Sequence, residues 1–164
     1  MNTTPRLGHY TIDTNRSSLS FTGRHMFGLF PVRGTFAIRG GTVDVAEPLG
    51  ESGVQAEIDA ATFTTGHARR DSDVRSARFL DASRHPLITF VSSSVDAERI
   101  TGALTVKDIS EVVTLQVGEV RADAESFRVR ATTRIDRTAF GVTAAGGLAS
   151  RDLDLTLEIT AVRA

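Results

Sequence analysis

The stretch Arg151–Thr160, RDLDLTLEIT, alternates strictly between polar and apolar residues and decides the fold class. Successive side chains of a β-strand point to opposite faces, so four aliphatic side chains share one face and polar side chains share the other. The pattern therefore predicts an antiparallel strand with one face buried and one face in solvent.

The same alternation recurs along most of the chain. It appears at Leu19–Phe21, Val54–Ile58, Ile100–Val106, Val113–Val117 and Phe127–Ala131. The branched side chains in these segments favour strands over helices. We expect about eight strands with one apolar face, which must stack as a sandwich or close as a barrel, because an open sheet leaves that face wet.

The apolar pattern changes parity between Val32 and Val45, with Gly40 and Gly41 in between. A shift of one residue turns side chains to the other face of a strand. Either a β-bulge in a bent strand or a simple loop explains the change, and the sequence leaves both open.

One segment departs from the strand pattern. Thr64–His85 contains helix-forming and charged residues, which predict one helix or two short ones capped by Thr64 or Thr65. Pro86 then disfavours helix, and the chain restarts as a strand over Leu87–Val95.

Composition narrows the function classes. The 164 residues predict a single domain over 1–164, and the net charge of −1 argues against nucleic-acid binding. The absence of cysteine excludes disulfides, iron–sulfur clusters and a cysteine nucleophile. The sequence shows neither a secretory signal nor an apolar run long enough for a membrane span, so a cytoplasmic location is expected.

Catalytic and metal motifs are weak. The four histidines are His9, His25, His67 and His85, and no Gly-x-Ser-x-Gly elbow accompanies them. The spacing of His67 and Asp71 suits one helix face, but surface or capping roles are commoner for such histidines. We therefore expect no catalytic residues, no metal and no cofactor.

Two charged clusters have competing interpretations. Arginines alternate with aspartates over Arg69–Arg78, which favours a solvated helix whose charges compensate one another. In the alternative interpretation, some of these arginines bind the anionic head group of a ligand. Asp136 and Arg137 follow a predicted strand, and we interpret them as an ion pair that pins a turn and plugs one end of a barrel.

Several motifs match a known family in order and together span nearly the whole chain. They are YTID at Tyr10–Asp13, SLSFTGRHMFGLFPVRGTF at Ser18–Phe36, RRDSDVRSARFLD at Arg69–Asp81 followed by HPLITF, ITGALTVKDISEVVTL at Ile100–Leu115, and IDRTAFGV at Ile135–Val142. On these residues the chain resembles the YceI-like, polyisoprenoid-binding family. It departs from the family pattern at Lys107–Ser110 and at Leu80, where a second Phe is common.

The resemblance implies an all-β protein with a short helical insertion, namely an antiparallel eight-stranded lipocalin-like barrel. It also implies a long apolar cavity, often a homodimer, and a non-enzymatic protein that binds or carries a polyisoprenoid or similar lipid. From strand parity and the family pattern we expect the lining to include Phe21, Phe36, Phe79, Phe90, Leu104, Leu115 and Phe140, with His25 or Arg70 near the mouth.

Two alternatives stay open at this stage. One is a hydrolase or isomerase that acts on an apolar substrate through His25 or His67 with a nearby aspartate. The other is a ligand-free dimeric stress or structural protein whose barrel is filled by its own side chains. The volume of the barrel interior separates the second alternative from a carrier.

Overall fold

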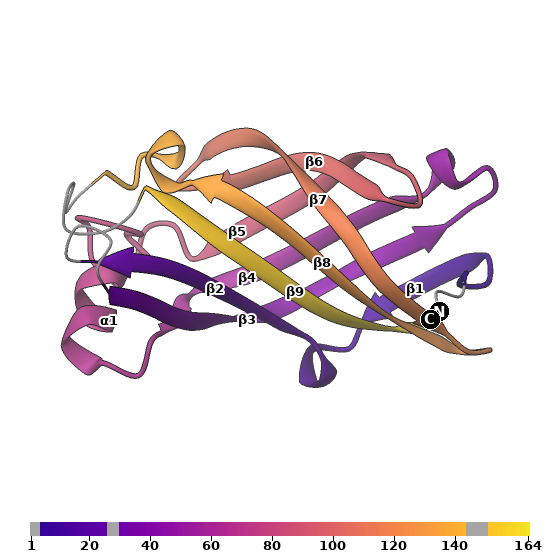
Figure 1. Cartoon of the computed structure of the whole chain (residues 1–164), viewed down its shortest axis with the longest axis horizontal. Coiled ribbons are helices and arrows are strands. Elements are labelled where there is room, and N and C mark those ends of the chain that lie inside the picture. The colour runs from indigo at the N-terminus through magenta and orange to yellow at the C-terminus, as the bar shows by residue number, and fades with distance from the viewer. Residues whose placement is uncertain (1–3, 26–29, 144–150) are drawn as a thin grey trace.

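The computed structural model describes residues 4–25, 30–143 and 151–164. The chain forms a long antiparallel β-barrel, as the resemblance predicts (Figure 1). Its strands are β1 Gly8–Ile12, β2 Ser18–His25, β3 Phe30–Val45, β4 Gly53–Thr64, β5 Leu87–Val95, β6 Arg99–Val106, β7 Ile109–Ala122, β8 Ser126–Asp136 and β9 Asp152–Arg163. The helices are α1 Ala68–Arg75 and three 3-10 turns, η1 Thr14–Arg16, η2 Leu49–Glu51 and η3 Arg137–Phe140.

These strands fill eight positions around the barrel because β1 and β2 share one. Both run antiparallel to β3 on one side and to β9 on the other. β1 pairs with the Thr42–Val45 part of β3, and β2 with its Phe30–Phe36 part. The short turn η1 interrupts this position between them. The predicted eight-stranded barrel is therefore confirmed, with one wall position built from two pieces.

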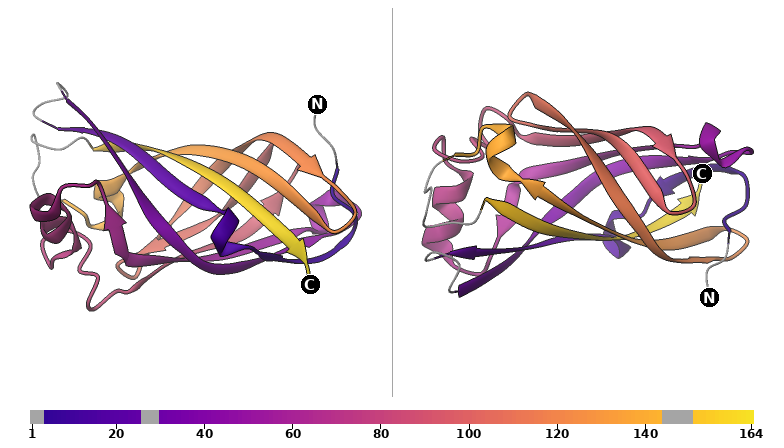
Figure 2. Two further views of the ribbon diagram at one scale, coloured as in Figure 1. Left: turned by 90° about the horizontal axis from the view of Figure 1, so that it is seen from below. Right: turned by 45° about the horizontal axis from the view of Figure 1, so that its top comes forward.

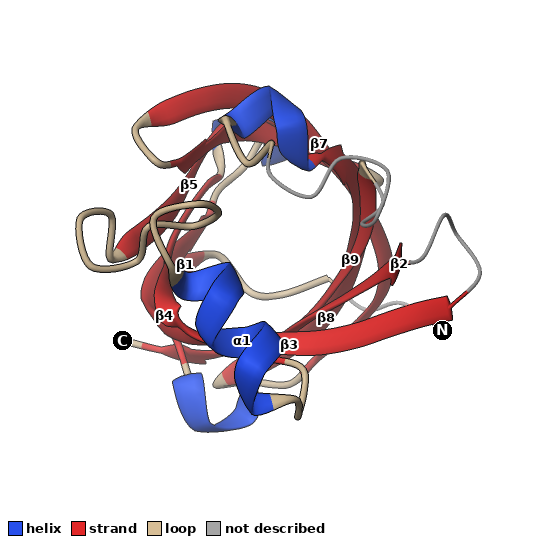
Figure 3. Cartoon of the chain, turned by 90° about the vertical axis from the view of Figure 1, so that its left-hand side faces the viewer, coloured by secondary structure: helices blue, strands red, loops and turns tan. Residues whose placement is uncertain are grey.

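The barrel closes through β3 and β4. Around the barrel the strands are hydrogen-bonded in the order β2, β9, β8, β7, β6, β5 and β4. β3 pairs with both β2 and β4 and so completes the ring. Viewed along its axis, the molecule is a ring of strands with α1 over the rim beside β3 and β4 (Figure 3). Closure turns the apolar strand faces inward and leaves the polar ones to solvent, as the alternation in Arg151–Thr160 predicts.

The parity change in β3 is a bulge within one continuous strand. Its register with β4 shifts between Thr35 and Ala37 and again between Ile38 and Gly40. Of the two explanations that the sequence leaves open, the bent strand is correct and the loop is wrong. Gly41 is required there because a Cβ would lie 2.4 Å from the carbonyl oxygen of Gln55.

The predicted helical segment contains a single short α-helix, α1, and continues as turns. Its cap was predicted at Thr64 or Thr65, and this is wrong, because His67 precedes the helix and its Nδ1 accepts from the Arg70 N–H at 3.2 Å. Both threonine hydroxyls donate instead to the carboxylate of Asp71. The strand predicted over Leu87–Val95 is confirmed by β5.

The barrel has two distinct ends (Figure 2). We call them the α1 end, where the helix lies, and the terminal end, where both chain termini lie. A small separate core packs at the terminal end around Tyr10, which is fully buried, with Val45, Phe127 and Ala161. The rings of Tyr10 and Phe127 meet edge to face with centroids 4.8 Å apart.

Candidate ligand-binding cavity

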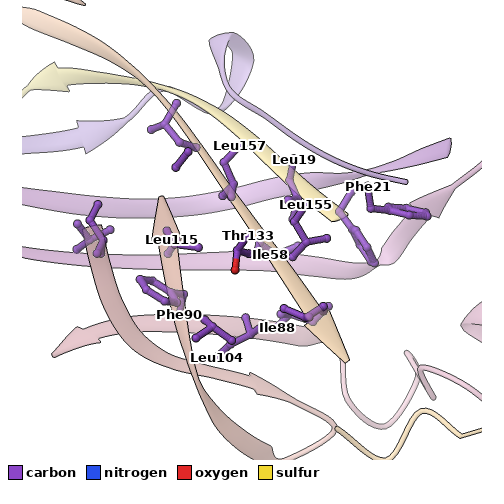
Figure 4. Close-up of a pocket in the computed structure, with 18 of the residues that line it drawn as sticks. Leu19, Phe21, Ile58, Ile88, Phe90, Leu104, Leu115, Thr133, Leu155 and Leu157 are labelled. Carbon is purple, nitrogen blue, oxygen red and sulfur yellow. The ribbon is translucent and has the colours of Figure 1, made fainter. Parts of the chain in front are cut away.

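The barrel encloses a cavity of about 480 Å³ lined almost entirely by apolar side chains. Most of them come from the strands, because residues of one parity point inward. On β9 these are Leu153, Leu155, Leu157 and Ile159, the four aliphatic residues of the stretch that decides the fold. Side chains from opposite walls converge on the same space, among them Phe90 (Figure 4).

All of the predicted lining residues with a described side chain contribute to the cavity wall. These are Phe21, Phe36, Arg70, Phe79, Phe90, Leu104, Leu115 and Phe140. The side chain of His25 lies outside the described residues. Whether any of these residues contacts a ligand stays a prediction.

An aromatic cluster lines the cavity towards the α1 end. Phe21 stacks on Phe63 with ring centroids 5.2 Å apart, and Phe36 lies 5.8 Å and 5.4 Å from these two rings. Gly34 makes room for the cluster, since a Cβ there would lie 2.5 Å from Cζ of Phe21. The rings present a firm apolar surface, because aromatic side chains bury a large area with few rotatable bonds.

Among the described residues, charged ones border the cavity only where it approaches the barrel ends. Arg70 on α1 and Arg137 on η3 lie at the α1 end, and Asp96 lies in an exposed turn at the terminal end. Asp44 also borders the terminal end, but its side chain pairs with His9 on the outer face of the barrel. Asp96 accepts from the backbone N–H groups of Glu98 and Arg99, and these bonds lower the pKa of its carboxyl. The lining is thus positive at the α1 end and apolar in the middle, and the acidic side chains at the terminal end are exposed to solvent.

Helix α1 is attached to the end of β4 by polar contacts. Asp71 is only 4% exposed and accepts from the Thr65 N–H at 2.9 Å and from the Thr64 hydroxyl at 3.1 Å. Burial acts to raise the pKa of Asp71, but the hydrogen bonds from Thr65 and Thr64 and the charge of Arg75 lower it overall. Arg75 donates from Nε to the Phe63 carbonyl at 3.0 Å. The prediction of a solvated helix is wrong for Asp71, because its carboxylate binds the barrel.

Asp136 and Arg137 both make hydrogen bonds at the end of β8, and the predicted ion pair between them stays a prediction. Asp136 caps η3 by accepting from the Thr138 N–H at 2.9 Å. Arg137 is buried and donates to the Val142 carbonyl at 2.7 Å. Burial lowers the pKa of Arg137, although an arginine remains charged at neutral pH. Its place at the barrel end was predicted, and its part in the cavity lining was not.

Several further lining residues were not predicted. Leu155, Leu157, Ile58 and Ile88 all follow from strand parity, so the alternation that defines the strands could have named them. Leu80 is buried and also lines the cavity.

The histidines with described side chains have structural contacts. His67 caps α1, and His85 lies 3.3 Å from a carboxylate oxygen of Asp108. His9 pairs with Asp44. Across residues 4–25, 30–143 and 151–164, no group of three His, Asp or Glu side chains is placed to hold a metal ion. No helix in these ranges has the length and hydropathy needed to cross a membrane.

A closed antiparallel barrel around a largely apolar cavity places the chain in the structural class of lipocalin-like barrels. The YceI-like domain model matches residues 10–161, so the chain belongs to the YceI-like family. Protein YceI of Escherichia coli O157:H7 is 30% identical over 160 residues, which cover 86% of this chain and 83% of that protein.

Solved structures share the fold. BcnA of Burkholderia cenocepacia superposes with a TM-score of 0.79 at 24% identity, covering 91% of this chain and 98% of BcnA. A domain from Saccharophagus degradans, described as a polyisoprenoid-binding domain implicated in plant cell wall breakdown, gives a TM-score of 0.76 at 14% identity. The match covers 97% of this chain and all of that domain.

Proposed function

We propose that this chain binds a polyisoprenoid or a similar long apolar lipid inside its barrel and acts as a carrier rather than as an enzyme. The cavity is the observation that supports the proposal. Its volume of about 480 Å³ falls within the range of ligand sites, about 300 to 1,000 Å³. An unfilled interior of this size favours binding over a barrel packed by its own side chains. The Saccharophagus degradans domain, described as polyisoprenoid-binding, has the same fold.

The shape of the barrel suits a chain-like ligand better than a compact one. β9 has 12 residues, which at about 3.3 Å each give a strand of about 40 Å. A strand tilt of about 40° reduces this to about 30 Å along the barrel axis. Residues from both ends contribute to the cavity wall, so the space extends along this axis.

Burial of hydrocarbon supplies the binding energy. Each CH₂ group removed from water contributes about 0.8 kcal/mol, and an isoprene chain offers many such groups. Part of that gain offsets the loss of translational and rotational freedom on association. Cavity length and width then decide which apolar molecule binds.

The first test is whether purified protein carries a lipid. Organic extraction followed by mass spectrometry should reveal a co-purifying apolar compound, and stripped protein should bind geranylgeraniol. Protein that yields no lipid and also fails to bind added prenyl alcohols would contradict the proposal.

A matched pair of variants then locates the binding site. Ala131 is buried on the inner face of β8, and Thr132 is the exposed residue beside it. Ala131→Phe should fill part of the cavity and lower geranylgeraniol affinity about tenfold, a loss of about 1.4 kcal/mol. Thr132→Phe adds the same ring outside and should leave affinity unchanged. Isothermal titration calorimetry measures both, with circular dichroism as a check on folding. Equal affinities would place the lipid outside the barrel.

The homodimer and the cytoplasmic location remain predictions. Sedimentation velocity of the purified chain and fractionation of cells that express it are the corresponding measurements.

A further inference from the structure

The charged residues of the lining give the cavity a direction. Arg70 and Arg137 lie at the α1 end, whereas no basic residue of the described ranges lines the terminal end. Thr133 lies among apolar side chains in the part of the cavity between them (Figure 4). A ligand with one anionic end therefore meets attraction at the α1 end and no opposite charge in the lining of the terminal end.

Arg137 places a cation in surroundings of low polarity. Arg137 is 8% exposed, and the cavity lining at this end also includes Phe140 and Val142. Electrostatic attraction is much stronger in such surroundings than in water, because little solvent screens the charge. An anion that reaches the α1 end of the cavity gains from this charge.

Arg70 contributes a second guanidinium from the helix. Its side chain is half-buried, and its Nε donates to the Thr65 hydroxyl at 2.9 Å. Within the described residues, this is the one hydrogen bond that its guanidinium makes. The planar fork of donors in a guanidinium matches the oxygens of a phosphate or carboxylate, which it binds through two parallel bonds.

We propose that the cavity binds its lipid in one direction, with an anionic head group at the α1 end beside Arg70 and Arg137 and the apolar tail towards the terminal end. This inference rests on the proposed lipid-binding function and adds the head-group class to it. The reverse orientation lacks this attraction, because no basic residue among those described lines the terminal end. The tail then approaches Phe127, which lines the cavity and packs on Tyr10.

The head-group test uses two ligands with the same chain, hexadecyl phosphate below its critical micelle concentration and hexadecanol below its solubility limit. Wild-type protein should bind the phosphate about tenfold more tightly. Arg70→Gln should remove most of that preference and leave hexadecanol affinity unchanged. Arg69→Gln removes the same charge from an exposed position on α1 and should alter neither affinity.

The outcomes separate this inference from the proposed function. Failure of wild-type protein to bind either ligand contradicts the lipid-binding function itself. Binding of both with equal affinity contradicts only the head-group inference, as does an equal effect of Arg69→Gln and Arg70→Gln. Inorganic phosphate controls for a site that accepts free phosphate, and displacement of hexadecyl phosphate by an equal concentration of it would overturn the inference.

A second measurement needs no variant. The chain has one tyrosine and no tryptophan, so Tyr10 is its only strong intrinsic fluorophore and lies at the terminal end. Hexadecyl phosphate brominated at its terminal carbon should quench Tyr10 fluorescence, because bromine quenches at short range. The isomer brominated beside the phosphate should quench much less. The opposite order would reverse the proposed orientation, and equal quenching would deny any fixed orientation.

Discussion

The two ends of the barrel are closed by different chemistry. At the terminal end, Tyr10 is fully buried against Phe127, and its hydroxyl donates to the Arg6 carbonyl at 2.7 Å. At the α1 end, a helix is held largely by hydrogen bonds around Asp71 and Arg75. Apolar burial stabilises more per residue than a few exchangeable hydrogen bonds, so the α1 end should open at the lower free-energy cost.

The largest expected effect comes from removing the buried ring at the terminal end. Tyr10→Ala should lower the free energy of unfolding by about 3 to 5 kcal/mol, because it leaves a cavity in a packed core. Tyr10→Phe keeps the ring and loses the hydroxyl contact, and should cost about 1 kcal/mol. Urea denaturation followed by circular dichroism measures both. Similar losses for the two variants would show that the ring does not seal this end.

The α1 end should be less costly to disrupt and its opening more local. Asp71→Ala leaves the Thr65 N–H without its acceptor and should cost about 1 to 3 kcal/mol. Hydrogen exchange should accelerate in α1 while the β8 and β9 amides stay protected. Asp73→Ala alters an exposed carboxylate on the same helix and should change stability by less than about 0.5 kcal/mol.

The Asp71→Ala variant also tests a pH dependence of stability. The pKa of Asp71 is lower in the folded protein than its ordinary value of 3.8, so its stabilising contribution is present above that value and is lost as pH falls through the folded pKa. The stability difference between wild type and Asp71→Ala should therefore be full at pH 7 and shrink below about pH 4. A difference that grows on acidification would contradict the assigned role.

The smallest effect concerns the hairpin between β6 and β7 at the α1 end. Lys107 and Asp108 have φ of 53° and 62°. This left-handed backbone conformation is strained for a residue with a side chain but not for glycine. Asp108→Gly should stabilise the protein by about 0.5 to 1 kcal/mol in urea denaturation. Its ion pair with His85 is 88% exposed on the Asp108 side and is worth little. Asp108→Ala loses the same pair but keeps the strain, so it should bring no gain.

Much of the fold follows from the sequence because the alternation of polar and apolar residues along a strand is a local property. The β5 range and the inward side chains of β9 needed only the alternation of apolar residues. The β3 bulge could not be told from a loop, since both reverse parity. The sharing of one position by β1 and β2 depends on their pairing with β3 and β9, which no local pattern contains.

The site was less predictable where polar side chains decide the outcome. The phenylalanines follow from parity and the family pattern. The capping role of His67 and the burial of Asp71 depend on how the helix meets the end of β4. Arg137 follows a strand directly, but its burial beside Phe140 results from the turn of η3.

The strand order also fixes when the ring can be completed during folding. β9 lies between β8 on one side and the shared β1 and β2 position on the other. It follows all of these strands in the sequence. Until β9 docks, the wall has a lateral slit along its whole length. Such long-range closure is slow compared with local pairing. On the proposed lipid-binding function, a hydrocarbon present at that stage enters sideways and supports docking of the last strand, so lipid supplied during synthesis should raise the yield of folded protein.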